Sequence, residues 1–254
     1  MMTRSPKFPW IVSFILIDAV FIFLLGGFNE SLFLALNSAF ASLPASFWQV
    51  VTSLSDPLIA PLITFSLFYR HPTFLRALFI AILIGMALNY GLKNAFAVPR
   101  PEAVLVSAAF NKIGPALTSF SFPSGHTLTV FLMAGLISAW YQHRNLSVLV
   151  FVVATLIALG RIAVGAHWPA DVAFGALLGW FGGWAAVKIC TYLPAIIPDK
   201  TQMALYGLTL FIGIYAVMAK TPYPDAQWLN TAAALFVIAY SVRKLTELIH
   251  LNKN

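Results

Sequence analysis

Long apolar runs separated by short polar turns occupy most of this sequence, and they decide what it can fold into. Hydrophobic residues make up 60% of the chain and charged residues 9%, whereas about a quarter of the residues of a soluble domain are charged. So few charged side chains cannot cover the surface of a soluble globule of this size. Runs of about 18 or more apolar residues are typical of membrane-spanning helices. We therefore predict an all-α fold, a polytopic transmembrane helical bundle.

The apolar runs predict eight membrane spans in a single domain that covers residues 1–254. Six spans would form a core at about residues 10–193, and two would form an extra helical hairpin at about residues 203–242. The segment Asn29–Pro44 is too short and too mixed to span, so we expect a helix at the membrane interface there. The expected spans are about Trp10–Gly27, Phe47–Tyr69, Phe74–Leu92, Ser124–Tyr141, Leu146–Gly165, Pro169–Leu193, Met203–Ala219 and Trp228–Val242.

Two features inside these spans bear on the fold. Pro57 and Pro61 lie in the second span, and we expect both to kink it, because proline lacks the N–H that a helix interior needs. Asp18 places an ionisable group within the first span. A carboxyl at membrane depth either has a function or faces the bundle in a protonated or hydrogen-bonded state.

The basic residues predict the orientation of the bundle. With eight spans, both termini lie on one side, and that side carries ten Lys and Arg against five on the other. The positive-inside rule then places both termini in the cytoplasm. We expect the protein to lie in the plasma, or inner, membrane. The formal net charge of +7 arises from cations at span ends, so it does not indicate a nucleic-acid partner.

Three polar patches lie on the outer side in this topology, and they break the apolar pattern. They are Lys93–Pro101, Phe122–His126 and Arg161–Asp171. Together they contain three cations and two histidines, with Asp171 and Glu102 as the only nearby acids. If the patches converge, their net positive charge favours an anion. Arginine presents a fork of donors that suits phosphate oxygens, and lysine contributes a point charge.

The patch Phe122–His126 opens the fourth span. Ser124 is well placed to cap that helix, and Gly125 lets a ligand approach the backbone closely. The free N–H groups at a helix N-terminus, together with the helix dipole, bind anions. His126, near the start of the helix, can exchange protons near neutral pH.

The patch Arg161–Asp171 combines a cation, a histidine and a carboxylate. Pro169 is typical of the first turn of a helix, which leaves His167 just before the sixth span and Asp171 within its first turn. A carboxylate that holds one imidazole nitrogen frees the other to act as a nucleophile. Taken singly, each residue has a common structural explanation as a helix cap, a dipole partner or a membrane anchor. Their occurrence together on one side of the membrane favours a functional site.

The same residues carry a resemblance to a known family. Lys93-x6-Arg100-Pro101, Pro123-Ser124-Gly125-His126 and Arg161-x5-His167-x3-Asp171 resemble the three-part signature of the type-2 phosphatidic acid phosphatase superfamily, which includes lipid phosphate phosphatases and undecaprenyl-diphosphate phosphatases. The third part often begins Ser-Arg, whereas this chain has Gly160-Arg161. The resemblance covers the third to the sixth span and does not account for the last two.

The resemblance implies a hydrolase that acts on lipid phosphates with no metal and no other cofactor. His167 would attack phosphorus and form a phosphohistidine, and Asp171 would orient it. His126 would protonate the leaving oxygen and then activate water. The phosphate oxygens would be held by Lys93, Arg100, Arg161, Ser124 and the Gly125 N–H.

The sequence leaves several functions open. Undecaprenyl diphosphate and phosphatidylglycerol phosphate are the favoured substrates, with phosphatidic acid and a lipid A phosphate also open. A lipid phosphotransferase would pass the phosphate to a second lipid, such as lipid A. A haloperoxidase is disfavoured because the relatives with that activity are soluble. An anion transporter is disfavoured because the polar residues gather at one membrane face, whereas transporter sites lie near the midplane. Retention of both histidines and Asp171 argues against a binding protein that has lost catalysis, and the oligomeric state stays open.

Overall fold

The computed structural model describes residues 12, 17, 27–68 and 71–251. Asp18 and almost all of the first expected span lie outside the described residues. The regular structure of the described part is helical throughout. The helices are α2 (Asn29–Phe40), α3 (Ala45–Ser53), α4 (Ile59–Phe68), α5 (Pro72–Phe96), α6 (Pro101–Val104), α7 (Gly125–Tyr141), α8 (Arg144–Ala163), α9 (Pro169–Cys190), α10 (Asp199–Met218) and α11 (Gln227–Leu251), with 3-10 turns η1 (Ser107–Ala109) and η2 (Pro224–Ala226).

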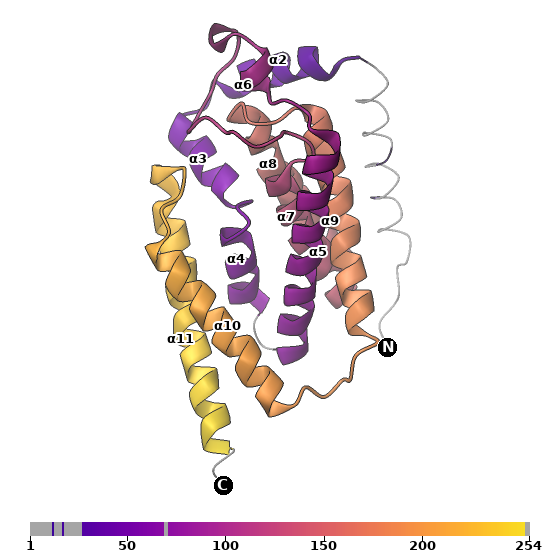
Figure 1. The fold of residues 1–254 in the computed structure, drawn as a ribbon, viewed down its shortest axis with the longest axis vertical. Coiled ribbons are helices and arrows are strands. Elements are labelled where there is room, and N and C mark those ends of the chain that lie inside the picture. The colour runs from indigo at the N-terminus through magenta and orange to yellow at the C-terminus, as the bar shows by residue number, and fades with distance from the viewer. Residues whose placement is uncertain (1–11, 13–16, 18–26, 69–70, 252–254) are drawn as a thin grey trace.

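The described helices form a bundle of the kind that crosses a membrane (Figure 1). Among them, α5, α8, α9 and α10 are long and apolar enough to span, and α2 with α3, bent by 117°, would make a fifth span. Helix α7 has 17 residues and α4 has 10. The predicted all-helical, multi-pass membrane bundle is confirmed. The count of six core spans plus two stays a prediction.

The second expected span is broken, and this differs from the kinked helix that the sequence predicts. Helix α3 ends at Ser53 and α4 begins at Ile59. In the break, the Asp56 carboxylate accepts hydrogen bonds from the backbone N–H groups of Leu58 (2.8 Å) and Ile59 (3.3 Å). This carboxylate caps a new helix, because the first N–H groups of a helix have no backbone partner. The expectation of a kink at Pro61 is wrong, since Pro61 lies in the first turn of α4, where proline is tolerated.

Helix α5 is longer than the third expected span. It begins at Pro72 and continues to Phe96, and Ala97 ends it in the left-handed conformation, with a φ of 47°. The Ala97 N–H donates to the Lys93 carbonyl (3.1 Å). Lys93 therefore lies in the last turn of α5, beyond the expected end of the third span at about Leu92. A rigid helix thus presents this cation.

Helices α7 and α9 lie in backbone contact. On α9, a Cβ atom added to Gly179 would clash with the carbonyl oxygen of Leu128, and one added to Gly183 would clash with the backbone N of Leu136. On α7, a Cβ added to Gly135 would clash with the carbonyl oxygen of Trp180. Small residues that let two backbones meet are typical of helix pairs in membranes. This contact fixes how the starts of α7 and α9 lie relative to each other.

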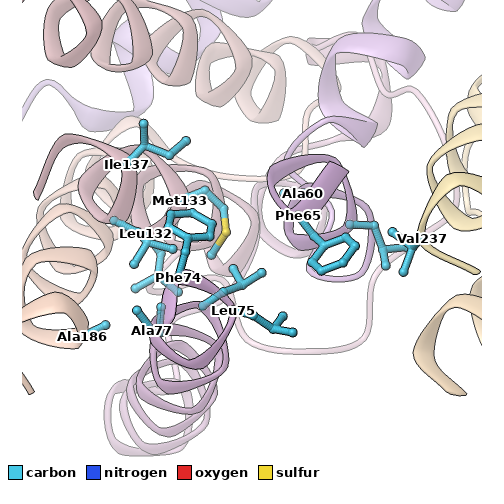
Figure 2. Packing of buried hydrophobic residues seen from close by; sticks show 14 of the residues in the cluster. Ala60, Phe65, Phe74, Leu75, Ala77, Leu132, Met133, Ile137, Ala186 and Val237 are labelled. Atoms are coloured by element: carbon cyan, nitrogen blue, oxygen red, sulfur yellow. The ribbon is translucent and has the colours of Figure 1, made fainter. Parts of the chain in front are cut away.

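The C-terminal helices α10 and α11 lie side by side along one flank of the bundle, next to α4 (Figure 1). Phe65 of α4 points toward Val237 of α11, while Phe74 and Leu75 of α5 pack near Met133 of α7 (Figure 2). All five side chains are buried in one hydrophobic cluster. The hairpin therefore packs directly on the rest of the bundle.

Replacing Gly179 with alanine tests the α7–α9 contact. The added methyl group has no room beside the Leu128 backbone, so we expect Gly179→Ala to lower the unfolding free energy by about 1–3 kcal/mol. The measurement is the midpoint of thermal unfolding of purified protein in detergent. Gly207→Ala on α10 is the matched control, because a Cβ there meets nothing within 4 Å and alanine favours helix. A Gly179→Ala midpoint equal to that of the wild type would contradict the contact.

Candidate active site

The three polar patches meet at one end of the bundle, beneath the long connection from α5 to α7 that contains α6 (Figure 1). Residues of that connection contact Arg100 and Lys93 from one side and Asp171 from another. The backbone N–H of Ser124 also donates to the Asp171 carbonyl (3.1 Å). The predicted convergence of the patches is therefore observed for these contacts.

His167 and Asp171 form a pair at the start of α9. Pro169 begins the helix, as predicted, and the Asp171 carboxylate reaches back over the first turn to accept the Trp168 N–H (2.9 Å). An acidic residue at the third helical position commonly satisfies the N-cap amide in this way. The same Asp171 oxygen lies 3.3 Å from Nδ1 of His167, and both residues are 1% exposed.

Arg100 fixes the other side of the His167 ring. Its Nη1 lies 3.2 Å from Nε2 of His167 and donates to the Ala166 carbonyl (2.8 Å). A guanidinium can only donate hydrogen bonds, so Nε2 is the acceptor and the imidazole proton lies on Nδ1, toward Asp171. The lone pair of Nε2 therefore points at the guanidinium of Arg100.

The electrostatic surroundings keep His167 neutral. Burial has the largest effect, followed by the positive charges of Arg100, Arg161 and Lys93, and together they hold the pKa of His167 well below its ordinary value. Burial acts by disfavouring the charged form, and nearby cations act in the same direction. The imidazole therefore keeps its lone pair at neutral pH, as a nucleophile requires.

Ser121 is a partner of this pair that the sequence did not single out. Its hydroxyl donates to Asp171 Oδ2 and lies 3.3 Å from His167 Nδ1, and the residue is fully buried. One residue, Phe122, separates it from the Pro-Ser-Gly-His run. A serine two residues before that run was a weak signal, because nothing in the sequence pairs it with a carboxylate 50 positions later.

Two cations are anchored by the same backbone segment. The Nζ of Lys93 donates to the Phe120 carbonyl (2.6 Å). Arg100 donates from Nη2 to that carbonyl (3.2 Å) and from Nε to the Ser119 carbonyl (2.6 Å). These oxygens carry only partial negative charge, so they orient the two side chains without neutralising them.

Arg161, in the last turn of α8, is held by two hydroxyl groups that the sequence did not single out. Its Nη1 donates to Thr52 Oγ1 of α3 (2.7 Å) and to the Tyr223 hydroxyl (3.2 Å), which comes from the connection between α10 and α11. Arg161 is 1% exposed, and its Nε has no hydrogen-bond partner within the described part of the chain. A buried guanidinium N–H without a partner is costly, so this donor calls for an oxyanion.

The Ser124–His126 stretch begins α7 as predicted. Ser124 caps the helix, and its Oγ accepts the Thr127 N–H (3.4 Å). His126 faces a residue that the sequence did not identify, because its Nε2 lies 3.7 Å from Oδ2 of Asp56 in the α3–α4 break. The expectation that Asp171 and Glu102 are the only nearby acids is thus wrong. Glu102 itself pairs with Lys112 (2.9 Å) and accepts the Leu117 N–H.

This arrangement can hold a tetrahedral oxyanion against a neutral imidazole. Three cations and the α7 N-terminus provide donors, His167 provides a lone pair, and His126 with Asp56 lies at the accessible side, with side chains 24% and 23% exposed. Across the described residues, no cluster of at least three His, Cys, Asp or Glu side chains is placed to hold a metal ion.

Comparison with known proteins gives matches to this part of the chain. The model of the PAP2 superfamily matches residues 74–195. Phosphatidylglycerophosphatase B of Escherichia coli (strain K12) is 32% identical over 96 residues, which cover 34% of this chain and 37% of that protein. The chain thus matches well under half the length of this curated relative.

Two solved structures share the fold. Aquifex aeolicus LpxE superposes with a TM-score of 0.55 at 30% identity and covers 63% of this chain and 94% of that one. The first transmembrane PAP2 type phosphatidylglycerolphosphate phosphatase from Bacillus subtilis superposes with a TM-score of 0.50 at 20% identity, covering 76% and 99%. At that identity, the second likeness concerns the fold alone.

Removing the Tyr223 hydroxyl tests the anchoring of Arg161. In Tyr223→Phe, Arg161 keeps Thr52 as a partner but loses one of two fixed contacts. We expect affinity for orthovanadate, a tetrahedral oxyanion, to fall roughly threefold to tenfold, in line with a hydrogen bond to a charged group. Isothermal titration calorimetry would measure it, with Tyr192→Phe as the control, since Tyr192 is 75% exposed. Equal affinities for the two variants would contradict the anchoring role.

Proposed function

Because the chain belongs to the PAP2 superfamily, we propose that it is a membrane lipid phosphatase, which removes a terminal phosphate from a lipid phosphate or lipid diphosphate. Three side chains do the chemistry: His167, His126 and Asp171. Lys93, Arg100, Arg161, Ser124 and the N–H of Gly125 bind the phosphate oxygens. The reaction runs through a phosphohistidine on His167 and uses no metal.

In the first step, Nε2 of His167 attacks phosphorus and the bond from phosphorus to the lipid oxygen breaks. His126 gives its proton to that oxygen, so the lipid leaves as a neutral alcohol, or as the monophosphate when the substrate is a diphosphate. Asp171 holds the Nδ1 proton and stabilises the positive charge that develops on the ring. The guanidinium groups and the α7 N-terminus stabilise the charge on the equatorial oxygens.

In the second step, His126 takes a proton from a water molecule, and the water oxygen attacks the phosphohistidine. The bond from phosphorus to Nε2 breaks, inorganic phosphate leaves, and His167 returns to its neutral form. The same residue thus serves as acid in one step and as base in the next. The Asp56 carboxylate, 3.7 Å from Nε2 of His126, stabilises the imidazolium that His126 carries before the first step and regains in the second.

One observation carries the proposal: Nε2 of His167 faces Arg100 at 3.2 Å while Nδ1 faces Asp171 at 3.3 Å. This places the lone pair of the imidazole where a cation-bound phosphate would lie. A purely structural histidine would have both nitrogens bound to groups that need no ligand.

Chemistry and charge support an inference about the substrate and about the side of the membrane. The site lies at one end of a membrane bundle, so a headgroup can reach it while the hydrocarbon stays in the bilayer. The excess of Lys and Arg on the side of the termini, ten against five, supports an extracytoplasmic site. Undecaprenyl diphosphate and phosphatidylglycerol phosphate are the favoured substrates, followed by phosphatidic acid and lipid A phosphate.

Phosphate release by purified protein in detergent with a chelator present tests the function. The panel comprises the four lipid phosphates named above, and we expect release from at least one. His167→Ala should reduce the rate to background, and His126→Ala should lower it roughly 10²- to 10⁴-fold, the range for loss of an acid–base catalyst. Both variants should unfold at the wild-type midpoint. Wild-type turnover by His167→Ala would overturn the mechanism.

The acceptor of the phosphate is tested in the same assay. If no inorganic phosphate appears but the lipid substrate is consumed when a second lipid is added, the phosphoryl group on His167 is being transferred to that second lipid. This outcome would replace the hydrolase with a phosphotransferase and leave the first step unchanged.

Replacing Asp56 with asparagine tests its role beside His126. The amide oxygen of asparagine can still cap α4, whereas the negative charge is lost. We therefore expect kcat to fall about tenfold, as for the loss of a favourable contact with a charged group, while the unfolding midpoint stays unchanged. Steady-state kinetics on the best substrate would measure it. An unchanged kcat would show that Asp56 is only a helix cap.

A further inference from the structure

A small cavity begins at the candidate active site and leads into the bundle. It has a volume of about 80 Å³ and lies between α4, α5 and α7. Gly125 and Asn89 line it at the site, and Pro57, Pro61 and Ile82 line it further in. The cavity therefore connects the phosphate-binding N-terminus of α7 with the apolar side of the bundle, where the lining residue Met86 is exposed.

A second and larger cavity adjoins the first. It has a volume of about 230 Å³, and Pro57, Pro61 and Ile82 line it as well. Its remaining walls come from α4, α5 and the C-terminal helix α10, which contributes Phe211 and Ile212 among others. Because the two cavities share three lining residues, they lie end to end along α4.

The polarity changes along this path. At the site end, Asn89 Oδ1 is buried without a hydrogen-bond partner among the described residues and lies 2.7 Å from where a Cβ of Gly125 would be. At the far end, nearly all the lining residues are apolar. A path that begins at Gly125, at the start of α7, and ends among hydrocarbon side chains fits a molecule with a phosphate head and a long apolar chain.

We propose that the two cavities form one binding site for the hydrocarbon chain of the substrate, and that α10 is the wall that selects chain length. The proposal rests on the proposed phosphatase function, because it deepens the same site. It assigns a function to the C-terminal hairpin. Its helix α10 lies outside residues 74–195, which the family model matches. A chain that reaches α10 gains apolar burial that a shorter chain does not.

Filling the far cavity tests the proposal. Ile212 lines it, so Ile212→Trp would occupy the space next to α4 and α5. The matched control is Ile214→Trp, because Ile214 lies on the same helix, is 48% exposed and lines neither cavity. The substrates are phosphatidic acids with two octanoyl or two oleoyl chains.

We expect Ile212→Trp to raise KM for the dioleoyl lipid roughly tenfold, which corresponds to lost burial of about two methylene groups. KM for the dioctanoyl lipid should stay within about twofold, as should both values for Ile214→Trp. The proposal would be overturned if Ile212→Trp changed KM equally for both lipids, or if Ile212→Trp and Ile214→Trp changed KM for the dioleoyl lipid equally. In those cases the cavity holds an ordinary bilayer lipid or serves only packing.

Photo-crosslinking separates this proposal from the proposed function. The His167→Ala protein would be mixed with a phosphatidic acid that carries a diazirine near the end of an oleoyl-length chain. We expect adducts on α10 that excess unlabelled phosphatidic acid removes and excess phosphatidylcholine does not. Adducts elsewhere, or competition by both lipids, would overturn the chain site. A wild type that releases no phosphate would instead contradict the proposed function, and the adducts would still decide this site.

Discussion

The close contact between α7 and α9 is the constraint on which the site depends. Three glycines let the two backbones touch, and the contact continues to the helix starts, where the Ser124 N–H donates to the Asp171 carbonyl (3.1 Å). The α7 N-terminus is thereby fixed beside His167 and Asp171. In a bilayer, such packing replaces the hydrophobic effect as the source of helix association. Backbone contacts along α7 and α9 therefore set the relative positions of the α7 N-terminus, His167 and Asp171.

The second constraint is electrostatic. Lys93, Arg100 and Arg161 surround a buried histidine, and the carbonyl oxygens of the α5–α7 connection orient the first two without neutralising them. Buried cations without counter-charges repel one another, and this repulsion weakens when an anion binds between them. Burial and, after it, the same positive charges lower the pKa of His167. One arrangement thus favours binding of an anion and keeps His167 unprotonated.

Local sequence rules predicted the parts of the site that lie within a few residues of one another. Pro169 marked the start of α9, which placed His167 and Asp171, and Ser124 marked the start of α7. The all-helical membrane fold followed from the apolar runs. Contacts between distant segments were not predictable: Asp56 with His126, Thr52 and Tyr223 with Arg161, and Ser121 with Asp171. Single polar residues in a helix or a loop carry no sign of their distant partner, and hydropathy does not show that a span breaks between α3 and α4.

The broken span and the C-terminal hairpin lie outside the residues that the family model matches, yet both contact residues of the signature: the broken span contacts Arg161 and His126, and the hairpin contacts Arg161. Thr52 lies near the end of α3, Asp56 lies in the break between α3 and α4, and Tyr223 follows α10. Tyr223 is 5% exposed, and its ring leaves no room for a side chain at Gly114. A hydroxyl held so tightly fixes Arg161 more firmly than a mobile side chain would. In the proposed mechanism the residues of the signature thus supply the reacting and binding groups, whereas the segments outside it contribute side chains that hold those groups in place.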